Sequence, residues 1–154
     1  MTASANQTSD SGEPAGLDKT FYTAVATATG GRAGHARSDD GALDVAIAPP
    51  KDLGGDGSAG TNPEQLFAAG YAACFGSALA NVAGKQGIDL GEVAITARVS
   101  IGPVGRGFGL AVVLEAALPD VPREQAETLL ARAHEVCPYS NATRGNIPVE
   151  LRLA

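Results

Sequence analysis

The first part of the chain carries the polarity pattern of a β-meander. Residues 21–29 are rich in threonine, valine and aromatic residues, and Gly30-Gly31 interrupts this stretch. After a turn signal at Asp40-Gly41, every second residue from 43 to 47 is apolar. Such alternation is typical of strands with one buried face, because successive side chains point to opposite faces. We expect paired strands here, followed by a surface loop over the glycine- and proline-rich residues 49–60.

A long helix is predicted to begin at the motif NPEQ, residues 62–65. Asparagine is a preferred N-cap, proline is favoured at the first helical position, and the glutamine is placed to close a capping box. The helix should run to about Lys85, where nearby glycines can end it. Residues 65–84 carry no charge over about the length of a bilayer, but alanine and glycine dominate them. A buried central helix therefore explains them better than a membrane span.

A second pair of antiparallel strands is predicted in the middle of the chain. Alternate residues are apolar from Val93 to Ile101 and again from Leu110 to Leu114. The glycine-rich residues 102–109 between them predict a hairpin turn. This stretch lacks the strand-to-helix context and the lysine of a phosphate-binding loop, so we do not interpret it as one.

The last part of the chain predicts a helix and a short strand. After Pro122, the apolar residues fall on one face of a helix that Pro138 ends. That face is formed by Ala126, Leu129, Leu130, Ala133 and Cys137. Alternation over residues 149–153 then predicts a closing strand. The order of strands, helix, strands, helix and strand indicates the α+β class.

Length and composition limit the kinds of protein that this chain can be. Its 154 residues fit one domain, expected over residues 20–154, after a disordered or extended tail at residues 1–19. The net charge of -6 provides no basic surface for nucleic acid or an anionic membrane. The N-terminus has no basic or apolar segment of a secretory signal. We therefore expect a cytoplasmic protein whose two cysteines are reduced thiols, with any disulfide transient.

The two cysteines, Cys74 and Cys137, admit two interpretations. Both lie on apolar helical faces, which suits inert core residues and also suits a concealed reactive pair. A nucleophilic Cys74 must be a thiolate, but an ordinary thiol is only about 3% ionised at neutral pH. The helix dipole is of little help, because Cys74 lies several turns beyond Pro63. A cation must supply the stabilisation.

An arginine is the natural cation for this purpose. At 4 Å and an effective dielectric constant of 20, one guanidinium contributes about 4 kcal/mol, whereas lowering a pKa by two units needs about 2.7 kcal/mol. Arg32 stands in the glycine-rich loop 30–34, although composition alone suggests a solvated surface charge. His35 and His134 are interpreted as structural or solvated. No metal-ligand spacing is present, so no metal is expected.

Several motifs together resemble one known family. Residues 61–75, TNPEQLFAAGYAACF, are similar to the organic hydroperoxide resistance branch of the OsmC-like superfamily. The similarity continues through GGR at 30–32, LDV at 43–45, PKDLGG at 50–55 and CPYSNATRGN at 137–146. It extends from about Thr20 to the C-terminus.

This resemblance implies a cysteine-based, peroxiredoxin-like thiol peroxidase. Cys74 matches the peroxidatic cysteine, Cys137 the resolving cysteine, Arg32 the activating arginine, and Glu64 the carboxylate that holds it. The implied fold has antiparallel sheets wrapped around two central helices in an intertwined homodimer. The implied substrates are alkyl and fatty-acid hydroperoxides. No bound cofactor is implied; reduction comes from an external dithiol such as a dihydrolipoyl group on a protein partner.

The expected chemistry agrees with these residue types. Attack of a thiolate on a peroxide oxygen releases an alcohol and leaves a sulfenic acid, which a second thiol converts to a disulfide. An arginine can stabilise the thiolate and donate hydrogen bonds to the peroxide oxygens. Four aromatic residues are candidates for an apolar substrate wall, with core packing as the default for each. They are Phe67, Tyr71, Phe75 and Phe108.

One distance along the helix limits where this site can be. Glu64 stands ten residues before Cys74, which is about 15 Å on an unbroken helix. Either the helix breaks near Gly70, or a second subunit supplies Arg32 and Glu64 to Cys74. We expect the second arrangement, a site at a dimer interface.

Two other functions remain open from the sequence. Hydrogen peroxide rather than an organic hydroperoxide could be the better substrate, which relative rates would decide. Alternatively, the thiol pair serves a redox sensor, or the pocket binds an apolar ligand without turnover. Catalytic consumption of peroxide with a dithiol would exclude both non-enzymatic functions.

Overall fold

The computed structural model describes residues 15–154. The predicted tail at residues 1–19 therefore lies mostly outside the described residues, and its separation from a domain beginning at residue 20 stays a prediction. Residues 15–19, which are described, form no helix or strand and are exposed.

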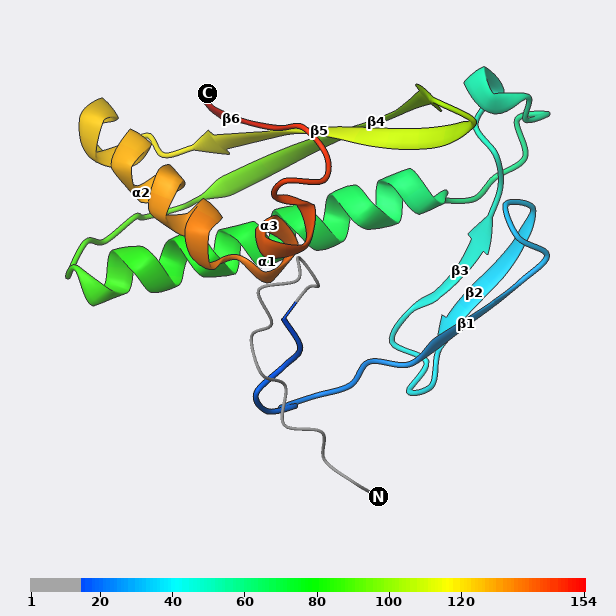
Figure 1. Ribbon diagram of the computed structural model, residues 1–154, viewed down its shortest axis with the longest axis horizontal. Coiled ribbons are helices and arrows are strands. Elements are labelled where there is room, and N and C mark those ends of the chain that lie inside the picture. Colours follow the sequence, from blue (N-terminus) through cyan, green and yellow to red (C-terminus); the bar gives the residue numbers. More distant parts are fainter. Residues whose placement is uncertain (1–14) are drawn as a thin grey trace.

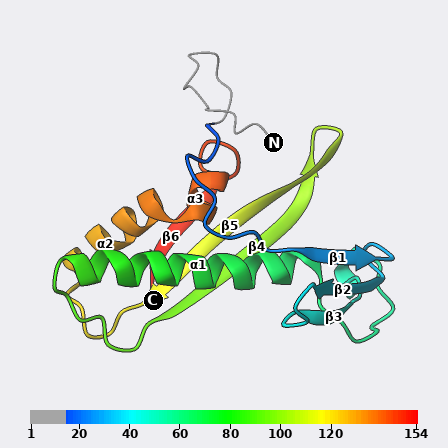
Figure 2. The same ribbon diagram turned by 90° about the horizontal axis from the view of Figure 1, so that it is seen from below.

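The central element is α1 (Pro63–Lys85), seen as one continuous rod in Figures 1 and 2. It begins and ends where the sequence predicts. The side chain of Asn62 accepts a hydrogen bond from the backbone N–H of Gln65 at 2.8 Å, as expected of an N-cap. The reciprocal half of the capping box is not formed. The Gln65 side chain instead accepts a hydrogen bond from the hydroxyl of Thr61 at 2.9 Å.

A small antiparallel sheet lies beside the N-terminal end of α1 (Figure 1). Its strands are β1 (Ala26–Thr29), β2 (Gly34–Ser38) and β3 (Asp44–Ile47), in that order. The strand expected over residues 21–29 begins only at Ala26, because residues 21–25 pair with no strand among residues 15–154. Phe21 is 89% exposed. The predicted surface loop over residues 49–60 contains one 3-10 turn, η1 (Lys51–Leu53).

The second sheet packs along α1 (Figure 1). It contains β4 (Ala94–Val104), β5 (Gly107–Ala117) and β6 (Val149–Leu153), in that order. β4 and β5 are antiparallel and extend into the glycine-rich residues 102–109, so their turn is tighter than the sequence suggested. β6 runs parallel to β5, which makes this sheet mixed rather than purely antiparallel.

Two further helices follow β5: α2 (Arg123–Val136) and α3 (Pro138–Thr143). The predicted apolar face of α2 is confirmed, because Ala126, Leu129, Leu130 and Ala133 are all buried. Pro138 ends α2 as expected, but it also occupies the first position of α3, which the sequence analysis missed.

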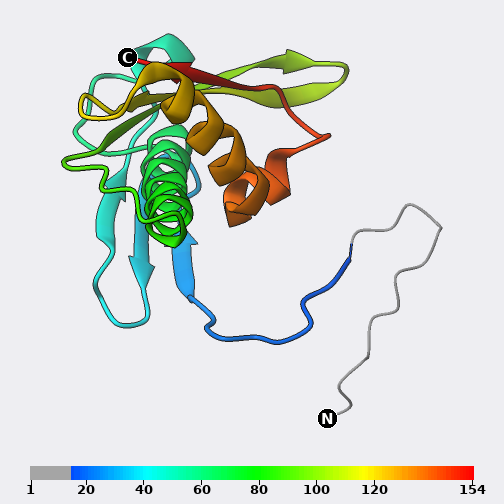
Figure 3. The ribbon, with the colours of Figure 1, turned by 90° about the vertical axis from the view of Figure 1, so that its left-hand side faces the viewer.

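The core lies between the second sheet and the helices α1 and α2. Figure 3 looks along α1 and shows both helices on the same side of this sheet. Tyr71, Phe75 and Leu79 of α1, Leu114 of β5 and Leu129 of α2 are fully buried there. The fold is of the expected α+β class, with helices and sheets segregated.

α1 is also long and apolar enough, by length and composition, to cross a membrane; the search covers the described residues. One of its faces packs on the core, while the opposite face is exposed along the whole helix in this single chain. Small residues occupy most of the exposed positions: Ala69, Ala73, Ser77, Ala80 and Gly84. Asn81 is exposed among them, and Pro63, Gln65 and Lys85 are exposed towards the ends of the helix. The helix therefore has one face that the rest of the described chain does not cover.

Candidate active site

The two thiols are brought together by the packing of α1 against the corner between α2 and α3. Cys74 lies in the middle of α1, and Cys137 is the residue between α2 and α3. Their sulfur atoms are 3.6 Å apart, and both thiols are free. A disulfide has its sulfurs about 2.05 Å apart, so a shift of roughly 1.5 Å would join them.

The two thiols differ in how far solvent can reach them. Cys137 is fully buried, whereas Cys74 is partly exposed. A peroxide arriving from solvent can therefore reach the sulfur of Cys74 but not that of Cys137. This difference agrees with the predicted roles of attacking and resolving cysteine.

The surroundings of Cys74 in this chain disfavour the thiolate. Burial raises the pKa of the Cys74 thiol above its usual value, and the neighbouring Cys137 raises it further. A hydrogen bond from the backbone N–H of Tyr139 lowers this pKa, but it offsets only part of the effect of burial. None of these influences comes from a cation.

The predicted cation is found at the N-terminal end of α1. The guanidinium of Arg32 forms a two-pronged ion pair with the carboxylate of Glu64, at 2.7 and 2.9 Å. The hydrogen bonds from Arg32 lower the pKa of Glu64, and those to Glu64 raise the pKa of Arg32. The pair therefore keeps both groups charged at neutral pH.

The loop that presents Arg32 depends on its glycines. Gly30 and Gly31 have φ angles of 75° and 58°, a conformation that residues with a side chain rarely adopt. At Gly34, a Cβ atom would lie 1.9 Å from the carbonyl oxygen of Thr29. The sequence GGRAG thus folds as a tight turn between β1 and β2, with the arginine at its tip.

A pocket of about 310 Å³ opens beside this ion pair. Arg32 and Glu64 form its charged end, and Phe67 from α1 and Phe108 from β5 contribute aromatic surface. The other lining residues are Pro63, Ile101, Gly109 and Leu110. A charged end with apolar walls suits a ligand that has a polar head and an alkyl or acyl chain.

The four aromatic candidates for a substrate wall divide into two groups. Phe67 and Phe108 line the pocket at Arg32. Tyr71 and Phe75 are fully buried in the core, so they have no surface with which to touch a ligand in this chain. Tyr139 was not among the sequence candidates, although its ring lies 6.0 Å from Phe67 and 5.6 Å from Tyr71 between ring centres.

The ion pair and the thiols lie at different points along α1. The helix is unbroken from Pro63 to Lys85, so the proposed break near Gly70 is wrong. Ten residues of helix separate Glu64 from Cys74, about 15 Å of axial rise. Because the structure describes a single chain, the supply of Arg32 and Glu64 by a second chain stays a prediction.

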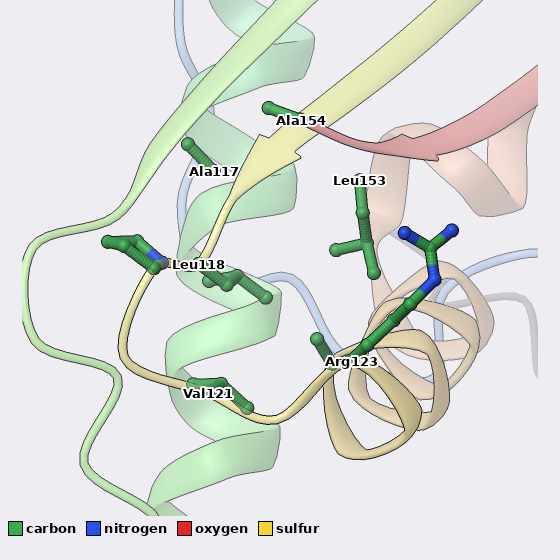
Figure 4. Close-up of a pocket in the computed structure, with 8 residues that line it drawn as sticks. Ala117, Leu118, Val121, Arg123, Leu153 and Ala154 are labelled. Carbon is green, nitrogen blue, oxygen red and sulfur yellow. The ribbon is translucent and has the colours of Figure 1, made fainter.

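A second pocket, of about 240 Å³, lies far along the chain from these residues, between the loop after β5 and strand β6. Leu118, Val121 and Leu153 surround it, and Arg123 lies at its edge (Figure 4). It contains neither cysteine, and Arg123 is paired with Glu127 at 2.9 Å. Within residues 15–154, no three metal-binding side chains gather at this pocket or elsewhere.

Comparisons with known proteins show the family to which the chain belongs. The family described as OsmC-like protein matches residues 54–152. The chain therefore belongs to the OsmC-like proteins, and within them to the branch of organic hydroperoxide resistance proteins.

Its relatives in that branch are similar over nearly their whole length. The organic hydroperoxide resistance protein of Xanthomonas axonopodis pv. citri is 56% identical over 138 residues, covering 89% of this chain and 97% of the relative. The corresponding protein OhrB of Bacillus subtilis is 51% identical, covering 86% and 98%. The crystal structure of an organic hydroperoxide resistance protein from Legionella pneumophila superposes with a TM-score of 0.84 at 51% identity, covering 88% and 99%.

Proposed function

We propose that this protein is a cysteine-based peroxidase that reduces organic hydroperoxides to alcohols. The observation that carries the proposal is the pair of free thiols 3.6 Å apart, one partly exposed and the other fully buried. The relatives named organic hydroperoxide resistance proteins support the choice of substrate. A cytoplasmic location fits two cysteines that stay reduced between turnovers.

The proposed cycle has three steps. The Cys74 thiolate attacks one peroxide oxygen, the O–O bond breaks, and the alkoxide takes a proton to leave as an alcohol. Cys74 is then a sulfenic acid, which the Cys137 thiol converts to a Cys74–Cys137 disulfide with release of water. An external dithiol, such as a dihydrolipoyl group on a protein partner, reduces this disulfide by two exchange steps and is itself oxidised to a disulfide. No bound cofactor is needed.

Arg32 would act on the first step. Placed against Cys74, its guanidinium would stabilise the thiolate and donate hydrogen bonds to the oxygen that gains negative charge. Glu64 would hold the guanidinium in a fixed orientation through the two hydrogen bonds at 2.7 and 2.9 Å. Within one chain, Arg32 and Glu64 lie too far along α1 to contact Cys74. Each site would therefore combine Arg32 and Glu64 of one chain with Cys74 of the other.

Two exposed apolar regions support a homodimer. The face of α1 formed by small residues, with no charge between residues 65 and 84, would be covered if two such helices packed together. Residues 17–25 extend away from the core with Leu17, Phe21 and Tyr22 largely exposed, and every residue of β1 is exposed. A second copy of the chain would bury both regions by the same symmetric contact.

The pocket at Arg32 supports a substrate with an apolar chain. Phe67, Phe108, Ile101 and Leu110 would contact an alkyl or acyl group, while the peroxide oxygens face the guanidinium. Hydrogen peroxide could not use this apolar surface. We therefore expect a higher kcat/KM for cumene hydroperoxide or a fatty-acid hydroperoxide than for hydrogen peroxide.

The deciding experiment is the mass of the reduced protein after one equivalent of cumene hydroperoxide, with peptide mapping under non-reducing conditions. A Cys74–Cys137 disulfide formed within seconds, together with continued peroxide consumption when a dithiol is added, is the expected result. A disulfide without repeated turnover would indicate a redox sensor. No reaction at either thiol would overturn the proposal and favour a ligand-binding protein.

A further inference from the structure

A network of hydrogen-bonded side chains joins residues that lie close in the sequence to the two cysteines. The phenol oxygen of Tyr71 is 2.9 Å from Ser140 Oγ and 3.0 Å from Thr143 Oγ1. Ser140 Oγ is also 2.8 Å from Nδ1 of His134. Tyr71, Ser140 and Thr143 are buried, so water does not satisfy these groups.

One assignment of donors satisfies every group in this network. The hydroxyl of Thr143 donates to the backbone carbonyl of Ser140 at 3.2 Å, Tyr71 donates to Thr143, Ser140 donates to Tyr71, and His134 donates from Nδ1 to Ser140. The reverse direction, from Thr143 through Tyr71 and Ser140 to Nδ1 of His134, fits the same three side-chain distances. In either direction the same four side chains are joined.

This network of hydrogen bonds joins the segments that carry the two thiols. Tyr71 lies one helical turn before Cys74 on α1. His134 and Ser140 lie three residues before and three residues after Cys137. In addition, the guanidinium of Arg144 donates to the backbone carbonyl of His134, which ties the end of α3 to α2. The corner that carries Cys137 is thus bonded to the turn of α1 that precedes Cys74.

We propose that Tyr71, Ser140, Thr143 and His134 are positioning residues for the resolving step, because their hydrogen bonds hold Cys137 within reach of an oxidised Cys74. This inference rests on the peroxidase function proposed above. None of the four side chains is hydrogen-bonded to a sulfur atom in the described structure. α3 has only six residues and is too short to be stable by itself, so its position depends on such contacts.

This role predicts that loss of one of these hydrogen bonds favours over-oxidation of Cys74. After peroxide has formed the sulfenic acid on Cys74, attack by Cys137 competes with a second peroxide, which gives a sulfinic acid. Slower attack by Cys137 lowers, in proportion, the peroxide concentration at which half of the protein is over-oxidised. The first oxidation does not involve Cys137, so its rate should fall much less, although the backbone N–H of Tyr139 in α3 also reaches Cys74.

The test uses Tyr71→Phe and Thr143→Val, each of which removes one hydroxyl and preserves the shape of the side chain. Thr143→Ser retains the hydroxyl at the same position and is the matched control. Stopped-flow measurement gives the rate of sulfenic acid formation and the rate of disulfide formation. Mass spectrometry gives the ratio of disulfide to sulfinic acid as the cumene hydroperoxide concentration rises.

For Tyr71→Phe and Thr143→Val we expect disulfide formation slower by about tenfold, sulfenic acid formation slowed much less, and over-oxidation at correspondingly less peroxide. Thr143→Ser should behave as the natural protein. If both hydroxyl-deletion variants form the disulfide at the natural rate, the positioning role is wrong. If the natural protein itself forms no disulfide with peroxide, the proposed function fails instead. Should Tyr71→Phe not fold, the Thr143 pair decides the matter.

Discussion

At the scale of single residues, Cys74 sits in surroundings that one chain leaves incomplete. Burial and Cys137 raise the pKa of its thiol, and the only stabilising group among the main influences is a backbone N–H. A peroxidatic cysteine needs the opposite, a thiolate at neutral pH. The peroxidase role proposed for Cys74 therefore requires stabilisation by a charged group from elsewhere, and Arg32 is the proposed candidate.

The first prediction concerns the pKa of Cys74 in the assembled protein. With Arg32 within 4–6 Å, this pKa should lie about 1 to 3 units lower than in an Arg32→Met variant. The natural protein should then react at a constant rate above its lowered pKa. The rate of the variant should keep rising with pH into the alkaline range, because its thiolate forms only there.

Thiolate absorbance against pH, measured in a Cys137→Ser background, reports Cys74 alone. Arg32→Lys is the matched control, because it retains the positive charge and loses only the two-pronged geometry. Equal thiol pKa values in the natural and Met forms would exclude Arg32 as the activating group.

At the scale of elements, the close packing of α3 against α1 depends on Gly70. A Cβ at this position would lie 2.8 Å from the phenol oxygen of Tyr139. The ring of Tyr139 can therefore cross the helix at Gly70 and contact both Phe67 and Tyr71. The same tyrosine provides the backbone N–H that reaches Cys74, so this packing also affects the thiol.

The second prediction compares alanine at two glycines of α1. At Gly76, where the nearest atom to the new methyl group is Cγ1 of Ile95 at an ordinary contact distance of 3.5 Å, alanine should stabilise the protein by about 0.5–1 kcal/mol through helix propensity. At Gly70 the same gain is opposed by displacement of Tyr139. We expect Gly70→Ala to be less stable than Gly76→Ala by about 1 kcal/mol or more.

Chemical denaturation at a fixed protein concentration measures this difference. Equal stability of the two variants would mean that Tyr139 moves aside without cost and that Gly70 is not needed for the packing of α3.

Local signals in the sequence were sufficient to predict where α1 begins and which face of α2 is buried. The motif at residues 62–65 gave the start of α1, because the N-cap and the proline act within one turn. The apolar face of α2 followed from its spacing alone. α3 was missed because Pro138 was interpreted only as the end of α2, although proline also favours the first position of a new helix.

What depends on distant parts of the chain could not be predicted locally. The parallel pairing of β6 with β5 is decided by where the chain returns after α3, not by the pattern of β6 itself. Likewise, the hydrogen bonds among Tyr71, Ser140 and His134 join residues from three helices. The candidate site residues came from the family resemblance, and the structure added their distances and burial.

At the scale of the whole molecule, the separation of Arg32 from Cys74 has a testable consequence for mixed assemblies. A Cys74→Ser chain supplies an intact Arg32, and an Arg32→Met chain supplies an intact Cys74. If each site takes one residue from each chain, a dimer of the two variants contains one complete site and one doubly defective site.

The third prediction is therefore recovery of activity by mixing two inactive variants. Joint refolding of equal amounts should give about a quarter of the natural activity, since half of the dimers are mixed and each has one working site of two. Refolding of Cys74→Ser with a Cys74→Ser, Arg32→Met double variant is the control and should give none. The absence of recovery in the first mixture would place the complete site within one chain.

The full burial of Cys137 also determines the order in which the two substrates can react in the proposed cycle. In the oxidised protein an incoming thiol should find only one sulfur of the disulfide open to attack, that of Cys74. The hydroperoxide requires the same atom, so the two substrates take turns at one entrance. We expect ping-pong kinetics, with parallel double-reciprocal lines when cumene hydroperoxide and dihydrolipoamide are varied.

A monothiol has no second thiol with which to release itself from Cys74. One equivalent should therefore leave an adduct on Cys74 and a free thiol on Cys137, and mass spectrometry of peptides can assign both. Intersecting lines, or an adduct on Cys137, would mean that oxidation opens the corner between α2 and α3. If the lines are parallel, no ternary complex forms on the productive route, and because both substrates use the same entrance, a large excess of either one should compete with the other. The protein would then be limited by whichever of its two substrates is scarcer at that moment.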